Sequence, residues 1–139
     1  MREKQLILIV DDEPNLAEIL STQLFASGYD VAMARSGEEA MKNAEELLPD
    51  LILMDIKMPK INGTDAALAI KENSKTQGIK IAFLTSQTDP WPGLAGNNQK
   101  GAQELGVDDF LQKTDDLQAN VAKIKEILAR PPLPPPKRI

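Results

Sequence analysis

The chain has 139 residues, 42% hydrophobic and 27% charged, which fits one soluble globular domain with a single core. Cysteine and histidine are both absent, which excludes disulfides, thiolate metal sites and a histidine base or zinc ligand. The net charge of -5 argues against direct nucleic-acid binding, which requires a basic face. It suits a carboxylate cluster that attracts a hard divalent cation.

The longest apolar run is too short to cross a bilayer, and no signal-peptide core follows residues 1–4. We therefore expect a cytoplasmic protein without a membrane segment. Residues 1–129 are expected to form one domain. Residues 130–139 are rich in proline, which predicts an extended or disordered tail or linker.

The first predicted element is a buried strand at Leu6–Val10, which ends in Asp11-Asp12-Glu13. Pro14 suits the first turn of a following helix. Apolar side chains then recur at helical spacing, at Leu16, Ile19, Leu20 and Leu24. Gly28 stops this helix, and residues 29–34 form a shorter and less apolar strand that is typical of a sheet edge.

Ser36-Gly-Glu-Glu39 has the form of a capping box, which predicts the start of a second helix. The helical pattern continues through residues 40–48, and Pro49 closes it. Leu51-Ile-Leu-Met-Asp55 is a continuous apolar run that leads into one carboxylate. Such a run is typical of a strand buried on both faces of a sheet. A turn follows, and a third helix starts near Thr64.

Ile79–Leu84 predicts another buried strand, and Thr85 follows it. Prolines and glycines punctuate residues 87–101, so any helix there is short or irregular. Val107–Gln112 predicts a fifth strand, broken by two aspartates and therefore an edge, and Lys113 ends it. A last amphipathic helix is marked by Leu117, Val121, Ile124 and Leu128.

Strands thus alternate with helices along the chain, which predicts a parallel sheet with helices on both faces. The first, third and fourth strands are the most apolar and should be central. The expected fold class is α/β: a flavodoxin-like, doubly wound, five-stranded parallel sheet with the order 2-1-3-4-5. Its switch point lies between strands one and three.

Polar residues follow these strands at one edge of the predicted sheet, where ligands bind in open α/β folds. They are Asp11 and Asp12 after strand one, Asp55 at the end of strand three, Thr85 after strand four and Lys113 after strand five. Three carboxylates in one pocket repel one another. Mg²⁺ would resolve the repulsion, because it prefers oxygen ligands and needs only one or two carboxylates.

A metal, a carboxylate, a hydroxyl and an ammonium together suit phosphoryl transfer. A carboxylate can attack phosphorus to form an aspartyl phosphate. The transferred group carries negative charge on its equatorial oxygens, so catalysis is mostly positioning and charge stabilisation. Mg²⁺ would hold one oxygen, Lys113 a second, and the Thr85 hydroxyl with backbone N–H groups a third. We interpret Asp55 as the phosphate acceptor.

Four motifs in chain order resemble the response-regulator receiver domain of two-component signalling, over roughly residues 5–129. They are the Asp11-Asp12 pair, Asp55-Ile-Lys-Met-Pro59 with Asn62-Gly63, Leu84-Thr85-Ser86, and Gly106-Val-Asp-Asp-Phe-Leu-Gln-Lys113. The resemblance implies that Asp55 takes a phosphoryl group from a histidine kinase, a phosphotransfer protein or a small phosphodonor. Asp12 would bind Mg²⁺ directly and Asp11 largely through water, with Asp55 and the Lys57 carbonyl as further ligands.

The resemblance also implies a conformational switch. Thr85 would move toward the phosphoryl group, and Phe110, the switch aromatic, would turn inward. The surface of the fourth helix, the fifth strand and the last helix would then change and control a downstream protein target or effector domain. Homodimer formation through that surface stays open. Such a protein would not be an enzyme beyond its own phosphorylation and dephosphorylation at Asp55.

One departure from the family pattern concerns Lys113. A proline in a cis peptide bond usually follows this lysine, and here Thr114 follows it. A cis bond before another residue type costs about 2.5–4 kcal/mol. The local geometry of Lys113 therefore does not follow from the resemblance, although its charge does.

Three other functions stay open at this point. A Mg²⁺-dependent phosphatase would also use an aspartyl nucleophile, but such enzymes usually have an acid two residues later, where this chain has Lys57. A flavodoxin-like FMN binder would need hydroxyls and glycines after the first strand, where this chain has acids. A degenerate receiver would serve only as a protein-binding module, and Thr114 is its best support.

Overall fold

The computed structural model of the chain describes residues 4–12, 14–55, 63–85, 109–112 and 116–131. Its strands form one sheet, ordered β2-β1-β3-β4-β5, and every neighbouring pair runs parallel. The strands are β1 Leu6–Val10, β2 Asp30–Ala34, β3 Leu51–Asp55, β4 Lys80–Thr85 and β5 Asp109–Gln112. The predicted fold class and strand order are confirmed.

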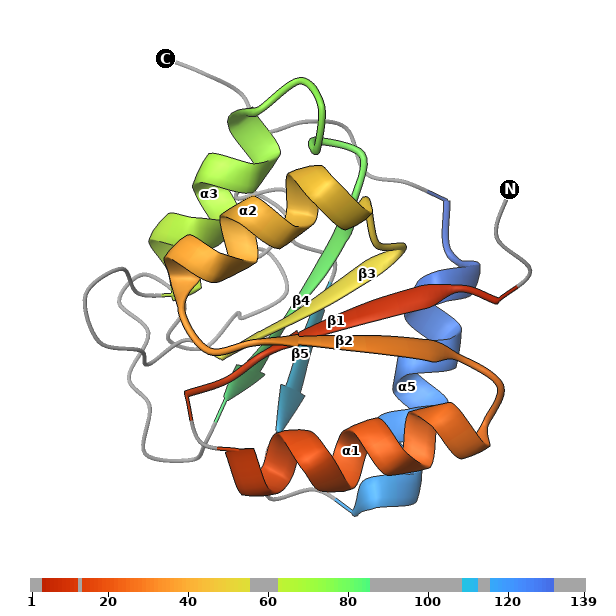
Figure 1. The fold of residues 1–139 in the computed structure, drawn as a ribbon. Coiled ribbons are helices and arrows are strands. Elements are labelled where there is room, and N and C mark those ends of the chain that lie inside the picture. Colours follow the sequence, from red (N-terminus) through yellow and green to blue (C-terminus); the bar gives the residue numbers. More distant parts are fainter. Residues whose placement is uncertain (1–3, 13, 56–62, 86–108, 113–115, 132–139) are drawn as a thin grey trace, which may run out of the picture.

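Helices cover both faces of this sheet. They are α1 Pro14–Ala26, α2 Gly37–Leu47, α3 Gly63–Glu72 and α5 Leu117–Ala129. Figure 1 shows α2 and α3 together on one face, with α1 and α5 on the other. The predicted turn after Asp55, the irregular segment at 87–101 and the proline-rich tail fall largely or wholly outside the described residues. Among the residues that are described, no helix combines the length and apolar character that a membrane span requires.

The central strand β3 shows why its sequence is apolar throughout. All five of its residues are buried. Ile52 and Met54 face the core beneath α2 and α3, whereas Leu51 and Leu53 face the core beneath α1 and α5. Successive side chains of a strand point to opposite faces, so a strand covered on both sides needs apolar residues at every position.

The Ser36 N-cap of the capping box predicted at the start of α2 is present, whereas the Glu39 carboxylate accepts from the residue before the N-cap. Ser36 Oγ accepts a hydrogen bond from the Glu39 backbone N–H at 3.1 Å, and Glu39 Oε2 accepts one from the Arg35 N–H at 3.3 Å. At the other end, Leu48 adopts a left-handed conformation with φ of 47°, and its N–H donates to the Ala44 carbonyl. Both ends of α2 therefore satisfy backbone groups that a helix terminus leaves unpaired.

The apolar face predicted for α1 needs one correction. Leu20 and Leu24 are buried as expected, but Ile19 is 55% exposed. Ala17 is buried instead, because positions 17, 20 and 24 lie on one side of a helix and position 19 points away from it. The small side chain of Ala17 is thus part of the core, whereas the larger side chain of Ile19 lies on the surface.

Candidate functional site

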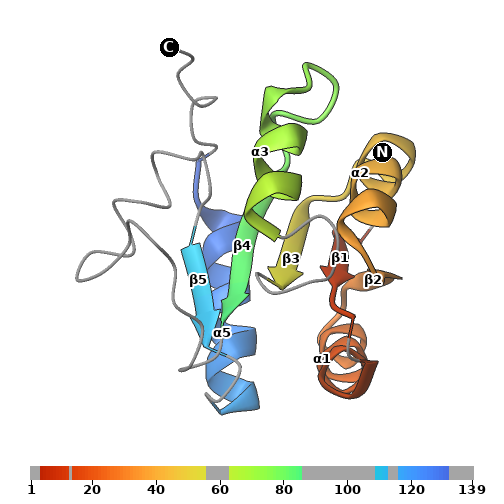
Figure 2. The same ribbon diagram turned by 90° about the vertical axis from the view of Figure 1, so that its left-hand side faces the viewer.

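Three carboxylates meet at one edge of the sheet. Asp11 directly follows β1, Asp12 follows it, and Asp55 is the last residue of the neighbouring strand β3. One carboxylate oxygen from each lies within 4.8 Å of those of the other two. The arrowheads of β1, β3, β4 and β5 point the same way, so this is the carboxyl edge of the sheet (Figure 2). The predicted convergence of these three residues is therefore present in the fold.

The three carboxylates differ in their exposure. Asp11 and Asp55 are only 3% and 2% exposed, whereas Asp12 is exposed. The Asp11 N–H donates to the Ala34 carbonyl at 3.1 Å, which continues the pairing of β1 with β2 past the end of the strand. The backbone thus fixes Asp11 beside Asp55, while Asp12 borders the solvent.

The chemistry of this donor set fits a hard divalent cation. All three groups are carboxylates, which suit Mg²⁺ and lack the softer ligands that copper or zinc prefers. Mg²⁺ binds oxygen at about 2.0–2.1 Å, so opposite ligands lie roughly 4 Å apart. The spread of the three carboxylate oxygens is close to that dimension. Asp11, Asp12 and Asp55 could therefore share one ion, with water completing its shell.

The other predicted site residues are described only in part. Thr85 is the last residue of β4 and pairs with Gln112 of β5, at the same sheet edge as Asp55. Its side chain is not described. Lys57 and Lys113 lie outside the described residues, so their predicted roles stay predictions.

Phe110, the predicted switch aromatic, lies inside the core. It is 8% exposed and belongs to the core beneath α2 and α3. Its ring centroid is 5.8 Å from that of Phe83, with the two rings tilted by 42°. This tilted contact is a favourable arrangement for two aromatic rings. Phe110 therefore packs inward, into this core.

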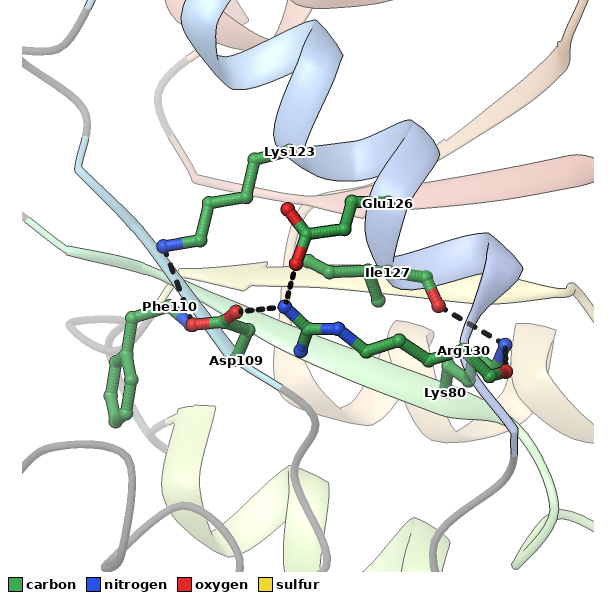
Figure 3. Close-up of polar contacts among 7 residues, drawn as sticks. All are labelled: Lys80, Asp109, Phe110, Lys123, Glu126, Ile127 and Arg130. Atoms are coloured by element: carbon green, nitrogen blue, oxygen red, sulfur yellow. Dashed lines mark hydrogen bonds and ion pairs between the residues drawn. The ribbon is translucent and has the colours of Figure 1, made fainter.

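A charged cluster ties β5 to α5 and was not predicted from the sequence (Figure 3). Asp109 Oδ1 accepts a hydrogen bond from the Phe110 N–H at 2.7 Å and lies 3.3 Å from Lys123 Nζ. Asp109 Oδ2 lies 2.9 Å from the Arg130 guanidinium, which also contacts Glu126 at 2.7 Å. The first residue of β5 is thereby held by two cations from α5 and its end. The hydrogen bond of Arg130 to Glu126 raises the pKa of the guanidinium above its usual value, and the hydrogen bond to Asp109 adds to this rise.

Two further polar side chains connect α5 to the sheet, one from β4 and one to the end of β5. Lys80 Nζ donates to the Ile127 carbonyl at 3.1 Å and to the Arg130 carbonyl (Figure 3). It also donates to the Leu128 carbonyl at 2.9 Å. This ammonium caps the C-terminal end of α5, where the helix dipole favours a cation. Asn120 of α5 is 6% exposed, and its Nδ2 donates to the Gln112 carbonyl at 3.1 Å.

The sequence held a signal for Asn120. It lies among the apolar positions of the last predicted helix, next to Val121, where a polar side chain is out of place. Its acceptor is eight residues away on another element and could not be identified without the fold.

The family model of the response regulator receiver domain matches residues 7–125. The chain belongs to this family. It is therefore a receiver domain of the kind used in two-component signalling, as its motifs predicted.

Curated relatives support the same assignment. The chain is 35% identical over 127 residues to the DNA-binding response regulator MtrA of Mycobacterium tuberculosis H37Rv, covering 91% of this chain and 52% of MtrA. It is 36% identical over 124 residues to the alkaline phosphatase synthesis transcriptional regulatory protein PhoP of Bacillus subtilis, covering 89% of this chain and 48% of PhoP. The receiver thus spans about half the length of these relatives.

Solved structures match over nearly their whole length. A putative response regulator from Chloroflexus aurantiacus is 34% identical, with a TM-score of 0.80, covering 92% of this chain and 100% of that one. A CheY-like receiver domain protein from Methanospirillum hungatei is 27% identical, with a TM-score of 0.77, covering 91% of this chain and 94% of that one.

These relatives contradict the partner prediction that was drawn from charge. The net charge of -5 predicted no direct binding of nucleic acid. MtrA is named a DNA-binding response regulator and PhoP a transcriptional regulatory protein, so the prediction was wrong for this class of protein. Net charge reports only on the residues that are summed. Here these span about half the length of the relatives, so the charge of this chain does not describe the rest of those proteins.

Proposed function

We propose that this receiver is a phosphorylatable switch in which Asp55 accepts a phosphoryl group in a Mg²⁺-dependent reaction. The donor is a histidine kinase or a small phosphodonor. The observation that carries the proposal is the cluster of Asp11, Asp12 and Asp55, whose carboxylate oxygens lie within 4.8 Å of one another at the carboxyl edge of the sheet. Membership of the receiver family supports this use of the cluster.

The proposed step is a displacement at phosphorus. A carboxylate oxygen of Asp55 forms a bond to phosphorus as the bond from phosphorus to the donor breaks, and the leaving group takes the electron pair. With acetyl phosphate, acetate leaves. Asp11, Asp12, Asp55 and the Lys57 carbonyl would hold Mg²⁺, which when bound would neutralise charge on the transferring group.

The remaining predicted residues act on the product. Lys113 contacts one phosphoryl oxygen, and Thr85 contacts another. Phe110 couples these contacts to the surface around β5 and α5, because it lies on β5 and its ring packs on Phe83 of β4. In this reaction the protein modifies only its own Asp55. The names of the curated relatives favour control of transcription as the output of a longer protein that contains such a receiver.

Intact-mass measurement after incubation with acetyl phosphate tests this proposal. The wild-type protein is expected to gain one phosphoryl group with Mg²⁺ and none with excess chelator. Asp55→Ala should gain none, whereas the matched variant Asp30→Ala, which removes an exposed carboxylate at the other end of the sheet, should be labelled like the wild type. Labelling of Asp55→Ala at the wild-type rate would refute the assignment.

A further inference from the structure

The peptide group between Gln112 and Lys113 is held by a side chain from another element. Asn120 Nδ2 of α5 donates a hydrogen bond of 3.1 Å to the Gln112 carbonyl. That carbonyl belongs to the planar peptide unit whose nitrogen is the Lys113 nitrogen. The hydrogen bond therefore restrains the direction of the Gln112 carbonyl at the end of β5.

Among the described residues, one strand lies beside this part of the chain. β5 has four residues and lies at the edge of the sheet, where it pairs with β4. Half of the backbone groups of an edge strand face no other strand. Within the described residues, the Gln112 side chain adds no hydrogen bond through its own buried Oε1. Asp109 ties the start of β5 to α5, and Asn120 ties its end.

An asparagine at this position is explained by that hydrogen bond rather than by packing. Asn120 is 6% exposed and lies beside Val121 in the buried face of α5. Asparagine is a poorer helix former than leucine, and burial of its amide is unfavourable unless the amide is hydrogen-bonded. An apolar side chain would fill the same space without these costs. The hydrogen bond to the Gln112 carbonyl therefore accounts for the buried amide at position 120.

We propose that Asn120 is a positioning residue for Lys113, which directs the lysine toward the phosphoryl group by orienting the peptide before it. This inference rests on the proposed function of Lys113. The residue after the lysine is Thr114, which has no ring to restrict its own backbone angle as a proline would. The hydrogen bond from Asn120 instead restrains the backbone before Lys113, at the Gln112 carbonyl.

A double-mutant cycle tests whether Asn120 acts through Lys113. The labelling rate with acetyl phosphate and Mg²⁺ would be measured for wild type, Asn120→Leu, Lys113→Ala and the double variant. We expect Asn120→Leu to slow labelling about tenfold when Lys113 is present and to add no further loss in the Lys113→Ala background. Equal losses in both backgrounds, or no loss in either, would overturn the proposal.

Controls separate positioning from loss of structure. Asn73→Leu removes another asparagine that donates a side-chain hydrogen bond, at 2.6 Å to Glu45, and should leave the rate unchanged. Asn120→Gln keeps an amide donor and should recover part of the rate. Mg²⁺ affinity should be the same in Asn120→Leu and wild type, since the carboxylate cluster is untouched. A matching fall in Mg²⁺ affinity would instead indicate general damage to the site and overturn the proposal.

A second measurement remains decisive if the wild type takes no label, which would refute the proposed function alone. The Lys113 amide should exchange its hydrogen faster in Asn120→Leu than in wild type, with β1 amides unchanged, because the local constraint is lost. Unchanged exchange at Lys113 would overturn the positioning role.

Discussion

At the scale of single residues, the three aspartates at the sheet edge combine proximity with unequal burial. Asp11 and Asp55 are nearly inaccessible, and Asp12 is exposed, yet their carboxylate oxygens lie within 4.8 Å of each other. Like charges at this separation repel, and burial strengthens the repulsion because water screens it less. The cluster should therefore destabilise the metal-free protein and bind a cation that removes the repulsion.

Neutralisation of Asp12 tests this account of the cluster. Asp12→Asn keeps the shape of the side chain and removes one of the three charges. A relief on the order of 1 kcal/mol is expected, which raises the melting temperature of the metal-free protein by roughly 3–6 °C. Mg²⁺ should raise the melting temperature of the variant less than that of wild type, because the ion has lost a ligand.

Glu18→Gln is the matched control for Asp12→Asn. It also removes one negative charge, but from an exposed position on α1 that is outside the cluster. Its stability should stay within about 0.5 kcal/mol of wild type, with the full Mg²⁺ effect. If the two variants gave the same melting temperatures with and without Mg²⁺, like-charge repulsion at the cluster would not be the explanation.

The site residues show what could be inferred at this scale from sequence. Carboxylates at strand ends could be recognised. The apolar run before Asp55 predicts a buried strand, and this places Asp55 at the carboxyl end of that strand. The partners of Asn120 and Asp109 were not recognisable. Their contacts join β5 to α5, and the distance between those elements is set by packing rather than by local pattern.

At the scale of elements, the edge strand β5 depends on α5 for its attachment. The Asp109 carboxylate accepts a hydrogen bond from the Phe110 N–H and forms ion pairs with Lys123 and Arg130. The Asp109 side chain is 12% exposed, whereas those of Lys123 and Arg130 are 41% and 29% exposed. Water weakens the two ion pairs from the side of the cations, and the largely buried carboxylate gives each contact more weight than a surface pair has.

Removal of this carboxylate tests the attachment. Asp109→Ala should lower the free energy of unfolding by about 1–2 kcal/mol, because the Phe110 N–H and two cations lose their acceptor. Glu126→Ala removes the other acid in contact with Arg130, at a side chain that is 65% exposed, and should cost less than about 0.5 kcal/mol. Urea unfolding of both variants measures the difference. Equal costs would show that the Asp109 contacts are ordinary surface ion pairs.

The helices and strands also show which features can be predicted from residues that are close in sequence. The N-cap at Ser36 and the apolar run of β3 were predicted correctly, because both depend on residues close in sequence. The apolar face of α1 was predicted wrongly at Ile19, because the buried side of the helix runs through Ala17, Leu20 and Leu24 and leaves Ile19 exposed. The size of an apolar side chain alone does not show which side of a helix is buried.

At the scale of the whole molecule, the strand order decides what the site contains. β1 and β3 are adjacent although a helix-strand-helix segment separates them in sequence, and this adjacency brings Asp11 and Asp12 beside Asp55. The order was predictable, because the most apolar strands must be central in a sheet that helices cover on both faces. The error about nucleic acid arose at the same scale, since net charge describes the receiver and not a longer protein that contains one.

The most direct test of the central claim is to identify which of the three neighbouring carboxylates carries the phosphoryl group. Protein labelled with acetyl phosphate and Mg²⁺ would be reduced with borohydride, which converts the phosphorylated aspartate to homoserine. Peptide sequencing by mass spectrometry would then locate the converted residue. Our account predicts conversion at Asp55 alone. Conversion at Asp11 or Asp12, or at none of the three in protein that has gained a phosphoryl group, would contradict it.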